Sequence, residues 1–414
     1  MRRLQIKRFF GLVALLAVSG SLQAQSADRL YGKITTRNGE VLEGLIRWGT
    51  NEAGWVDLFN GNKPIPEEHN EELLRMLGQE KEEPREFAFL GFRIDLDDDR
   101  GLPRRAASAI RFGHIRTIEP TGRNRALLTL KSGRQVEFVG GSNDLGNGLG
   151  KTLIEDTRKG TRQLKWHDIT LVEFRPVPPE IRSKFGSRLY GRLTTRRGEQ
   201  FTGYVTWDLD EVLGKDVLDG KDQGEDQEID FEEIASIQRK SSSAATVVLK
   251  SGREMVLDDS NDVDDDNRGI LVSDPGFGQV TVPWSEFDRL DLQPNPASVG
   301  FGDFSEAKRL SGVITTDSGA HYKGTIRWDN DEEYSWEILD GSIRRMDFDI
   351  ELGLVQSIEK HSGGSRVTLK DGRSFDLGDS TDLDEDNKGI FVQQSDGKKV
   401  LVRWAEFRIA VFEG

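Results

Sequence analysis

The sequence of 414 residues contains no cysteine, and this absence removes several classes of chemistry. Without a thiol there is no disulfide staple, no cysteine nucleophile and no lipid attached to a cysteine behind a signal segment. A chain that leaves the cytoplasm without disulfides needs domains large enough to bury their own cores. The composition therefore suits a bacterial periplasm or outer surface better than a small secreted domain of a eukaryote.

Long apolar runs are almost absent as well. The one notable run, at residues 9–18, follows a basic start and precedes small residues that end at Ala24. It is too short to span about 30 Å of hydrocarbon, and its pattern is typical of a signal peptide. We therefore predict that residues 1–24 are removed near Ala24. The mature chain is expected to be periplasmic or secreted, without a transmembrane segment.

Histidine is scarce, and acidic residues outnumber basic ones by 72 to 57. The chain has five histidines, and no two of them have the spacing of metal ligands. No Gly-x-Ser-x-Gly segment offers a serine nucleophile. A net charge of −15 argues against nucleic acid as a partner, because such binding depends on neutralising phosphates. The acidic surface could attract cations or a basic protein surface, or it could serve solubility alone.

What the chain does contain is an internal repeat in three copies. The segment Arg-Leu-Tyr-Gly-Lys-Ile-Thr-Thr at residues 29–36 returns in similar form at residues 188–195 and 309–316. A tryptophan follows the glycine of each copy by sixteen positions, at Trp48, Trp207 and Trp328. A long internal period predicts an array of similar modules, and such arrays more often build binding surfaces than single catalytic pockets.

Each repeat consists of two similar halves that end on the same pattern. In the second halves this pattern begins at Trp166, Trp284 and Trp404. Strict alternation before the tryptophan gives way to a spacing of three after it, which predicts a strand, one helical turn and a further strand. The alternation places the six repeat tryptophans in the core. Trp55 and Trp336 stand outside the shared pattern and are better candidates for exposure.

A glycine also lies inside the second strand of each predicted opening hairpin, at Gly44, Gly203 and Gly324. Glycine weakens the interior of a strand and often marks a place where the strand changes direction. We therefore predict a bulge or a sharp bend at these three positions.

The order of hairpin, loop, two strands, short turn and final strand resembles the Sm-like and SH3-like small β-barrels. The resemblance covers all six halves and concerns the fold alone, because these motifs carry no functional residue of those families. It implies an all-β fold of three tandem repeats, each a pair of small barrels, at residues 28–176, 186–294 and 306–414. RNA binding is not implied, because the loops lack a basic or aromatic set for stacking bases.

The first repeat carries an insertion between its halves, at about residues 62–108. Residues 66–83 are predicted to form a short helix, because a proline stands near the start and an apolar stripe follows. The stripe consists of Leu73, Leu74, Met76 and Leu77. We expect it to cap an open barrel edge. Docking onto a partner is the alternative.

Two acidic loops, at residues 262–269 and 382–389, are the sharpest candidates for chemistry. Carboxylates at the first, third and fifth positions of a turning loop are how calcium collects oxygen ligands. The predicted ligands are Asp262, Asp264, Asp266, Asp382, Asp384 and Asp386. The match to a calcium loop is partial, because the sixth position is Asn and the twelfth lacks glutamate. A solvated acidic loop is the alternative.

The first repeat provides an internal comparison for these loops. It keeps an aspartate only at the first of the three positions, Asp144. A residue present in all three copies is better explained by a turn that it fastens. We therefore predict a structural role for Asp144, Asp262 and Asp382.

Together these features predict an exported, non-catalytic binding or scaffold protein of the bacterial cell envelope. Loop surfaces of a β-barrel array would meet a protein or another envelope component, and no cofactor other than calcium is expected. Two alternatives stay open. One is a calcium-dependent surface or adhesion module, and the other is a hydrolase that acts on envelope polymers.

Overall fold

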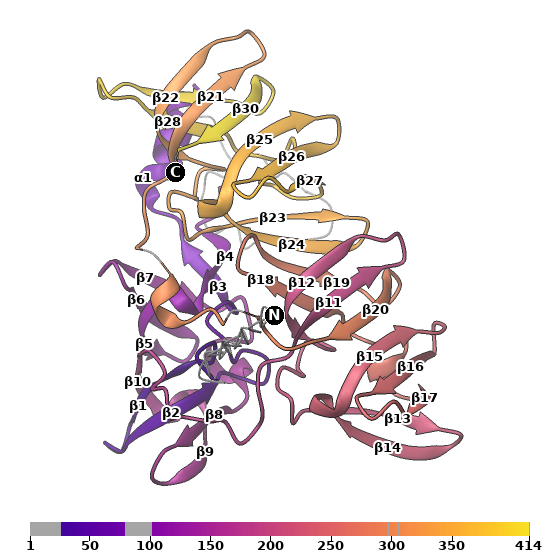
Figure 1. Cartoon of the computed structure of the whole chain (residues 1–414). Helices are drawn as coiled ribbons and strands as arrows, with labels where there is room; N and C mark the ends of the chain where they lie inside the picture. The colour runs from indigo at the N-terminus through magenta and orange to yellow at the C-terminus, as the bar shows by residue number, and fades with distance from the viewer. Residues whose placement is uncertain (1–25, 79–101, 297, 305, 414) are drawn as a thin grey trace, which may run out of the picture.

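The computed structural model describes residues 26–78, 102–296, 298–304 and 306–413, and it shows an all-β protein (Figure 1). Strands account for 52% of the residues and helical segments for 9%, in four antiparallel sheets, so the all-β prediction is confirmed. The signal peptide predicted for residues 1–24 lies outside the described residues. Within the described ranges, no helix combines the length and the apolar character needed to cross a membrane.

The first repeat contributes ten strands. They are β1 (Tyr31–Thr36), β2 (Val41–Arg47), β3 (Leu58–Pro64), β4 (Arg105–Arg111), β5 (Ile115–Gly122), β6 (Arg125–Leu130), β7 (Gln135–Val139), β8 (Thr152–Asp156), β9 (Gly160–Leu164) and β10 (Ile169–Phe174). Eight of them form one sheet in the order β7-β6-β5-β10-β1-β2-β8-β9, and β3 and β4 form a separate two-stranded sheet.

The second and third repeats also contribute ten strands each. Those of the second are β11 (Tyr190–Thr195), β12 (Gln200–Thr206), β13 (Val217–Asp222), β14 (Glu225–Asp230), β15 (Ile234–Arg239), β16 (Ala244–Leu249), β17 (Glu254–Asp258), β18 (Ile270–Asp274), β19 (Gly278–Val282) and β20 (Phe287–Leu292). Those of the third are β21 (Ser311–Thr316), β22 (His321–Arg327), β23 (Ile338–Ile343), β24 (Met346–Glu351), β25 (Val355–His361), β26 (Gly364–Leu369), β27 (Ser374–Leu377), β28 (Ile390–Gln393), β29 (Lys399–Val402) and β30 (Phe407–Phe412).

One arrangement of five strands recurs in all three repeats. The order β5-β10-β1-β2-β8 returns as β15-β20-β11-β12-β18 and as β25-β30-β21-β22-β28. The last strand of each repeat therefore lies between its first strand and the strand that closes its first half. In each repeat one second-half strand therefore lies between two first-half strands of the same sheet. The predicted division of each repeat into two separate small barrels does not describe these sheets.

The core of each repeat is centred on two tryptophans, one from each half. Trp48 meets Trp166 edge to face with 6.3 Å between ring centroids. The corresponding pairs Trp207–Trp284 and Trp328–Trp404 both lie at 6.2 Å. All six side chains are buried, as predicted. Edge-to-face contacts of this kind contribute about 0.5–1.5 kcal/mol beyond the buried area.

The two tryptophans outside the repeat pattern are buried too, so the prediction of exposure for Trp55 and Trp336 is wrong. Trp55 packs at 4.8 Å from Phe301, which lies in the segment between the second and third repeats. Trp336 stacks on Tyr334, and both belong to the core cluster of the first repeat. Contacts between repeats therefore bury these rings, and a comparison of repeat patterns does not predict such contacts.

The bulge predicted at the three inner glycines is absent, because the register of each opening hairpin is uninterrupted, and the sharp bend given as its alternative stays a prediction. Gly44 pairs with Gly32 in an uninterrupted register between β2 and β1. A Cβ atom on Gly44 would lie 1.9 Å from the carbonyl oxygen of Glu155 in the neighbouring strand β8. Glycine is needed here because the adjacent backbone approaches closely, and the strand remains regular.

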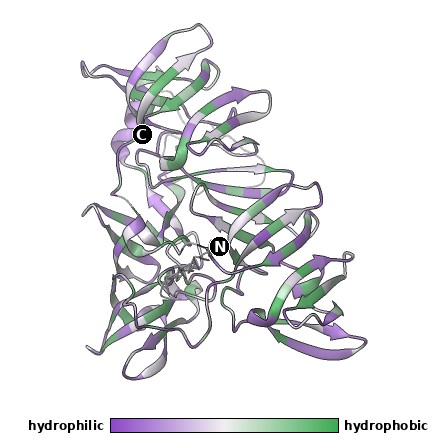
Figure 2. Cartoon of the chain, in the orientation of Figure 1, coloured by the Kyte–Doolittle hydropathy of each residue, from purple (hydrophilic) through white to green (hydrophobic). Residues whose placement is uncertain are grey.

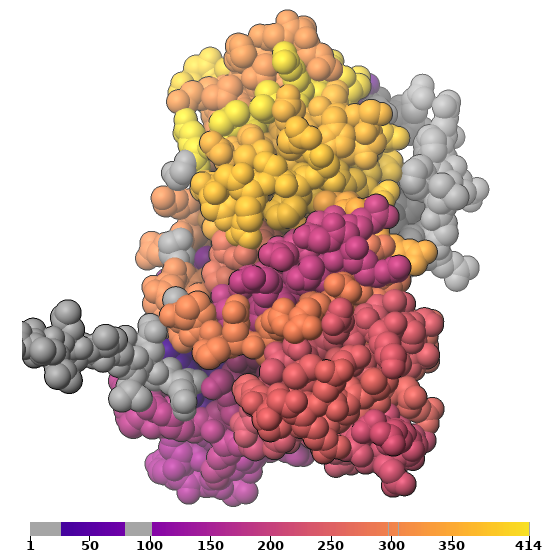
Figure 3. Space-filling model, turned by 45° about the vertical axis from the view of Figure 1, so that its right-hand side comes forward, coloured from indigo at the N-terminus to yellow at the C-terminus, as the bar shows by residue number. Residues whose placement is uncertain are grey.

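The three repeats pack into one body (Figure 1, Figure 3). Strand β19 of the second repeat pairs with β24 of the third, so one twelve-stranded sheet runs through both. A single hydrophobic cluster likewise spans these two repeats. Hydrophobic residues alternate with hydrophilic ones along the strands in the second and third repeats, as Figure 2 shows.

The insertion of the first repeat contains helix α1 (Glu67–Met76). It begins at the predicted proline, and residues 79–83 of the predicted helix lie outside the described residues. Within the apolar stripe, Leu73 is buried and the other three residues are half-buried. The helix packs against the third repeat, on strands far from its own repeat in the sequence (Figure 1).

Candidate functional site

A carboxylate nine positions after the first tryptophan recurs in every repeat, at Asp57, Asp216 and Glu337. One oxygen of each accepts two backbone N–H groups of the preceding turn, at distances of 2.5–2.8 Å. These bonds fix the side chain relative to the backbone. We call the three residues the junction carboxylates.

The other oxygen of each junction carboxylate forms an ion pair with a basic side chain from a different repeat. The distances are 2.8 Å for Arg188 to Asp57, 2.7 Å for Arg47 to Asp216 and 2.5 Å for Lys63 to Glu337. Each repeat therefore presents the same acceptor to a neighbour. The junction carboxylates fix how the three repeats sit against one another.

Lys63 is buried and has several carboxylates around it. Its ammonium lies near three carboxylates of the third repeat, at 3.4 Å from Asp331, 3.6 Å from Glu332 and 2.5 Å from Glu337. Burial opposes the charge of Lys63, but the attraction of these three groups outweighs it and raises the lysine pKa. Because Lys63 ends the strand that leads into α1, this contact holds the helix against the third repeat.

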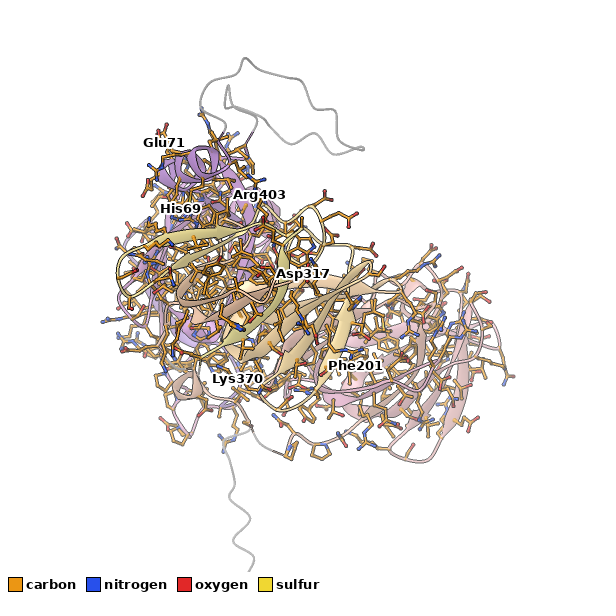
Figure 4. All side chains as sticks on the ribbon, turned by 90° about the horizontal axis from the view of Figure 1, so that it is seen from above. His69, Glu71, Phe201, Asp317, Lys370 and Arg403 are labelled. Atoms are coloured by element: carbon orange, nitrogen blue, oxygen red, sulfur yellow. The ribbon has the colours of Figure 1, made fainter. Side chains whose placement is uncertain are left out.

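A groove of about 360 Å³ lies between α1 and the outer face of β22, β28 and β29. Figure 4 shows His69 and Glu71 on the helix, with His69 on the side toward the third repeat. The charged lining is balanced between four basic and four acidic side chains. The basic side chains are Arg75, Arg309, Arg327 and Lys399, and the acidic ones are Glu68, Glu71, Glu72 and Glu333.

Arg327 forms the floor of this groove. Its guanidinium lies over the ring of Phe391, at 3.9 Å from the centroid, and donates to Glu72 at 3.0 Å. The side chain is buried, yet its Nε–H finds no hydrogen-bond partner in the structure. A buried donor without a partner is rare in proteins, and this one is covered by its surroundings.

His69 faces the groove from α1. Burial lowers the pKa of His69, and the nearby Arg327 lowers it further, so the ring is neutral at pH 7. Its Nδ1 atom is buried without a hydrogen-bond partner, while Nε2 lies 3.9 Å from Glu333. Two buried polar atoms without hydrogen-bond partners, His69 Nδ1 and Arg327 Nε, therefore lie behind the surface of the groove.

The aspartates that open the acidic loops are structural, as predicted. Asp262 and Asp382 are buried, and each accepts a backbone N–H, from Asp219 at 2.8 Å and from Asp340 at 3.2 Å. Asp144 does the same for Asn60 at 2.6 Å. Burial raises the pKa of Asp144 and of Asp262 to about 6. These carboxylates tie the acidic loops to the neighbouring hairpins.

The third-position aspartates of the two loops accept hydrogen bonds from the backbone of their own turns. Asp264 accepts the backbone N–H of Asp266 at 2.9 Å, and Asp384 accepts that of Asp386 at 3.0 Å. The side chains of Asp266 and Asp386 are exposed. In the described part of the chain, neither loop brings its three predicted calcium ligands together with their oxygens within 4.8 Å of one another, and calcium binding stays a prediction.

Three other acidic side chains lie close together, and the comparison with calcium-loop spacing did not predict this cluster. In the described part of the chain, Asp208, Asp210 and Glu211 are the one group of three such side chains whose ligand atoms all lie within 4.8 Å. Arg268 neutralises it, at 2.8 Å from Asp208 and 2.5 Å from Asp210. The sequence signal was the run Trp-Asp-x-Asp-Glu after Trp207, which returns after Trp328.

Each repeat also contains a glutamate four positions after the first tryptophan, and one oxygen of each is buried without a partner. These residues are Glu52, Glu211 and Glu332. Burial, with a hydrogen bond that the protonated Glu211 donates to Asp210, raises the pKa of Glu211 to about 10. A proton and Arg268 thus cancel two of the three negative charges of the acidic set in the second repeat.

No protein-family model, curated protein sequence or solved structure matches this chain. The comparisons therefore assign neither a fold family nor a function. The geometry of the groove and of the junction carboxylates is the basis for the proposals that follow.

Proposed function

We propose that this is an exported, non-catalytic binding protein of the bacterial cell envelope whose groove beside α1 receives a segment of a protein partner. The observation that carries the proposal is the groove of about 360 Å³ between α1 of the first repeat and the strands of the third, lined by charged side chains of both signs. Concave sites with a few placed polar groups are where proteins receive ligands.

The groove has the properties of a preformed site. Its two walls belong to the first and third repeats, and the buried contact between Lys63 and Glu337 holds them together. A site that is already assembled loses little conformational entropy on binding. The ionic contact of Glu72 with Arg327 at 3.0 Å also keeps the guanidinium in place over its aromatic ring.

The chemistry of the walls favours a polypeptide over a strongly charged polymer. Four basic and four acidic side chains line the groove, so its net charge is close to zero. Backbone carbonyl oxygens of an extended segment could accept from the exposed side chains of Arg75 and Arg309, and its N–H groups could donate to Glu71. This pattern supports a protein partner, and the net charge of −15 argues against nucleic acid.

A groove-filling substitution tests the proposal. Gln393 is exposed on β28 and lines the groove, so Gln393→Trp should occupy the space with little effect on the fold. Ser395 is equally exposed in the following turn but lies outside the lining, so Ser395→Trp is the matched control. Affinity capture from an envelope extract, followed by titration calorimetry with the purified partner, gives the readout.

We expect the control to bind the partner as the unchanged protein does and Gln393→Trp to bind at least ten times more weakly. Equal affinity of both variants would place the partner on another surface. A calcium-dependent module is the second candidate, and the acidic set of Asp208, Asp210 and Glu211 is the observation that favours it.

A further inference from the structure

A second pocket, of about 510 Å³, lies in the first repeat where four connections between strands meet. The connections are those between β1 and β2, β5 and β6, β7 and β8, and β9 and β10. Their contributions to the lining are Arg37, Arg123, Asn147, Trp166 and His167. Small-molecule sites in proteins have volumes of about 300–1,000 Å³. The pocket is therefore large enough for a small ligand, and it shares no lining residue with the groove beside α1.

The charge of this pocket is of one sign. Among the described residues that line it, Arg37 and Arg123 are charged and none is a carboxylate. Both arginines are exposed, and neither forms an ion pair with a described residue. His167 adds an imidazole, which lies 3.5 Å from Asp168 outside the lining. Basic side chains gathered in a concave site attract anions.

Hydrogen bonds hold the walls of the pocket in place. The indole N–H of Trp166 donates to the backbone carbonyl of Gly122 at 2.9 Å. Arg37 donates from Nε to the carbonyl of His167 at 3.0 Å and from its backbone N–H to the carbonyl of Asp168 at 2.7 Å. The bond from Nε orients the guanidinium, and its two Nη atoms have no hydrogen-bond partner among the described residues. A site assembled in advance loses little entropy on binding.

A proline in the first repeat stands where the other repeats carry a long basic side chain. Pro120, Arg239 and Lys360 each follow by two positions the isoleucine that pairs with the last strand of their repeat. Arg239 lies over the ring of Trp284, at 6.0 Å from the centroid. Lys360 donates to the backbone carbonyl of Trp404 at 3.0 Å. Pro120 lines the pocket and is too short to extend across it in this way.

The polarity of the equivalent place is different in the third repeat. Arg37 and Asp317 hold equivalent positions, because the backbone N–H of each donates to the carbonyl two residues after the second tryptophan of its repeat. Asp317 accepts a hydrogen bond from the ammonium of Lys360 at 3.2 Å. The third repeat thus supplies both charges of an ion pair, whereas the pocket of the first supplies the positive charge. An anion from outside would complete the pair.

The loop between β7 and β8 carries no negative charge where it borders the pocket. Asn147 stands where Asp265 and Glu385 stand in the acidic loops. Gly146 precedes it with a φ of +74°, and a Cβ atom there would lie 2.8 Å from the backbone carbonyl oxygen of Arg123. Glycine therefore lets the turn that carries Arg123 approach the loop. These differences from the other repeats remove negative charge and make room for a positive one.

We infer that this pocket binds a phosphate group, either free or at the end of a small molecule. Guanidinium groups suit phosphate oxygens because their N–H groups form a planar fork. Donors come from three separate turns, on Arg37, Arg123 and His167, and the oxygens of a tetrahedral phosphate can accept from several directions. A carboxylate has two oxygens in one plane, and a single guanidinium satisfies both. The inference goes beyond the proposed function, since the pocket and the groove are separate.

Titration calorimetry of the purified chain at low ionic strength tests the inference with glycerol 3-phosphate, inorganic phosphate and succinate. The tighter phosphate should bind once per chain with a dissociation constant of about 1 mM or lower, and succinate about ten times more weakly. Tighter binding of glycerol 3-phosphate identifies a phosphorylated molecule as the ligand, and equal or tighter binding of inorganic phosphate identifies the free ion. Failure of both phosphates to bind at about 10 mM, or equal affinity for succinate, would overturn the inference.

Two substitutions taken from the other repeats make the test specific. Arg123→Ser introduces the residue of the second repeat, Ser242, and Arg37→Asp introduces that of the third, Asp317. Each should weaken phosphate binding about tenfold or more, because a lost guanidinium removes charge-assisted hydrogen bonds. Both arginines are exposed in turns, so the circular dichroism of the variants should match that of the unchanged chain.

Arg162→Ser is the matched control. Arg162 is exposed on β9 of the same repeat and lies outside the lining of the pocket, so this variant should bind phosphate like the unchanged chain. Equal losses of affinity in Arg162→Ser and Arg123→Ser would show that overall charge, and no particular pocket, attracts the ions. That result, or unchanged binding in both pocket variants, would refute the inference.

Discussion

Lys63 and Glu337 are 274 positions apart in the sequence, and their side chains meet at 2.5 Å in a buried contact. The contact joins the first repeat to the third, next to the helix of the insertion, which packs on strands of the third repeat.

Replacing Lys63 by methionine should lower the free energy of unfolding by about 3–5 kcal/mol, because it leaves buried carboxylates without their cation. Lys33→Met is the control, since Lys33 forms a partly exposed pair with Glu43 at 3.5 Å and such pairs contribute about 0–1 kcal/mol. Urea unfolding of both variants measures the difference. Similar losses in the two would contradict the role given to Lys63.

The buried glutamates should make stability depend on pH. Because the pKa of Glu211 is raised from 4.5 to about 10, the folded chain holds this proton more tightly than the unfolded chain does. The corresponding stability is present below pH 4.5 and declines as pH rises through 10. Glu211→Gln cannot ionise, so its free energy of unfolding should gain on that of the unchanged chain from pH 5 to pH 9. If the free energies of unfolding of the two proteins change in parallel with pH, Glu211 is not the source of the pH dependence.

Calcium at millimolar concentration should leave the melting temperature unchanged, because Arg268 and a proton already cancel two of the three negative charges of the acidic set around Asp208. Arg268→Ala should expose these carboxylates and create a calcium-dependent rise in the melting temperature. Differential scanning calorimetry with and without calcium provides the measurement. If the unchanged chain is stabilised by calcium and Asp264→Asn with Asp384→Asn abolishes the effect, the calcium-dependent module becomes the better proposal.

Gly44→Ala should destabilise the first repeat by about 1–3 kcal/mol, since the added Cβ would lie 1.9 Å from a backbone carbonyl and β2 would have to move away from β8. Gly302→Ala is the control, because a Cβ there meets nothing within 4 Å. Thermal unfolding of the two variants separates the effect of crowding from that of the glycine's own flexibility. Equal melting temperatures would mean that the strands separate easily.

The features that recur in all three repeats could be predicted from the sequence. The tryptophan core follows from alternation, which fixes the buried face of a strand. The structural role of Asp144 follows from the comparison of copies, because its repeat lacks the later carboxylates of the acidic loops. In these cases a local rule and the repeat pattern point to the same conclusion.

Contacts made once between repeats could not be predicted in this way. The junction carboxylates recur, but their cations come from a strand, a hairpin and the start of a repeat, as Arg47, Lys63 and Arg188 show. The groove depends on where α1 docks, and the local amphipathic pattern does not specify its partner. Trp336 is buried for the same reason, since the surface that covers it belongs to another repeat.

The position of β10 between β1 and β5 limits which segments such a chain can gain or lose. A repeat truncated before its final strand leaves two central strands with no common neighbour, so it has no smaller version with an intact sheet. Duplication or loss of material should therefore occur in whole repeats. During synthesis the opening strand of each repeat must wait, unpaired on one side, until the last residues of that repeat have emerged.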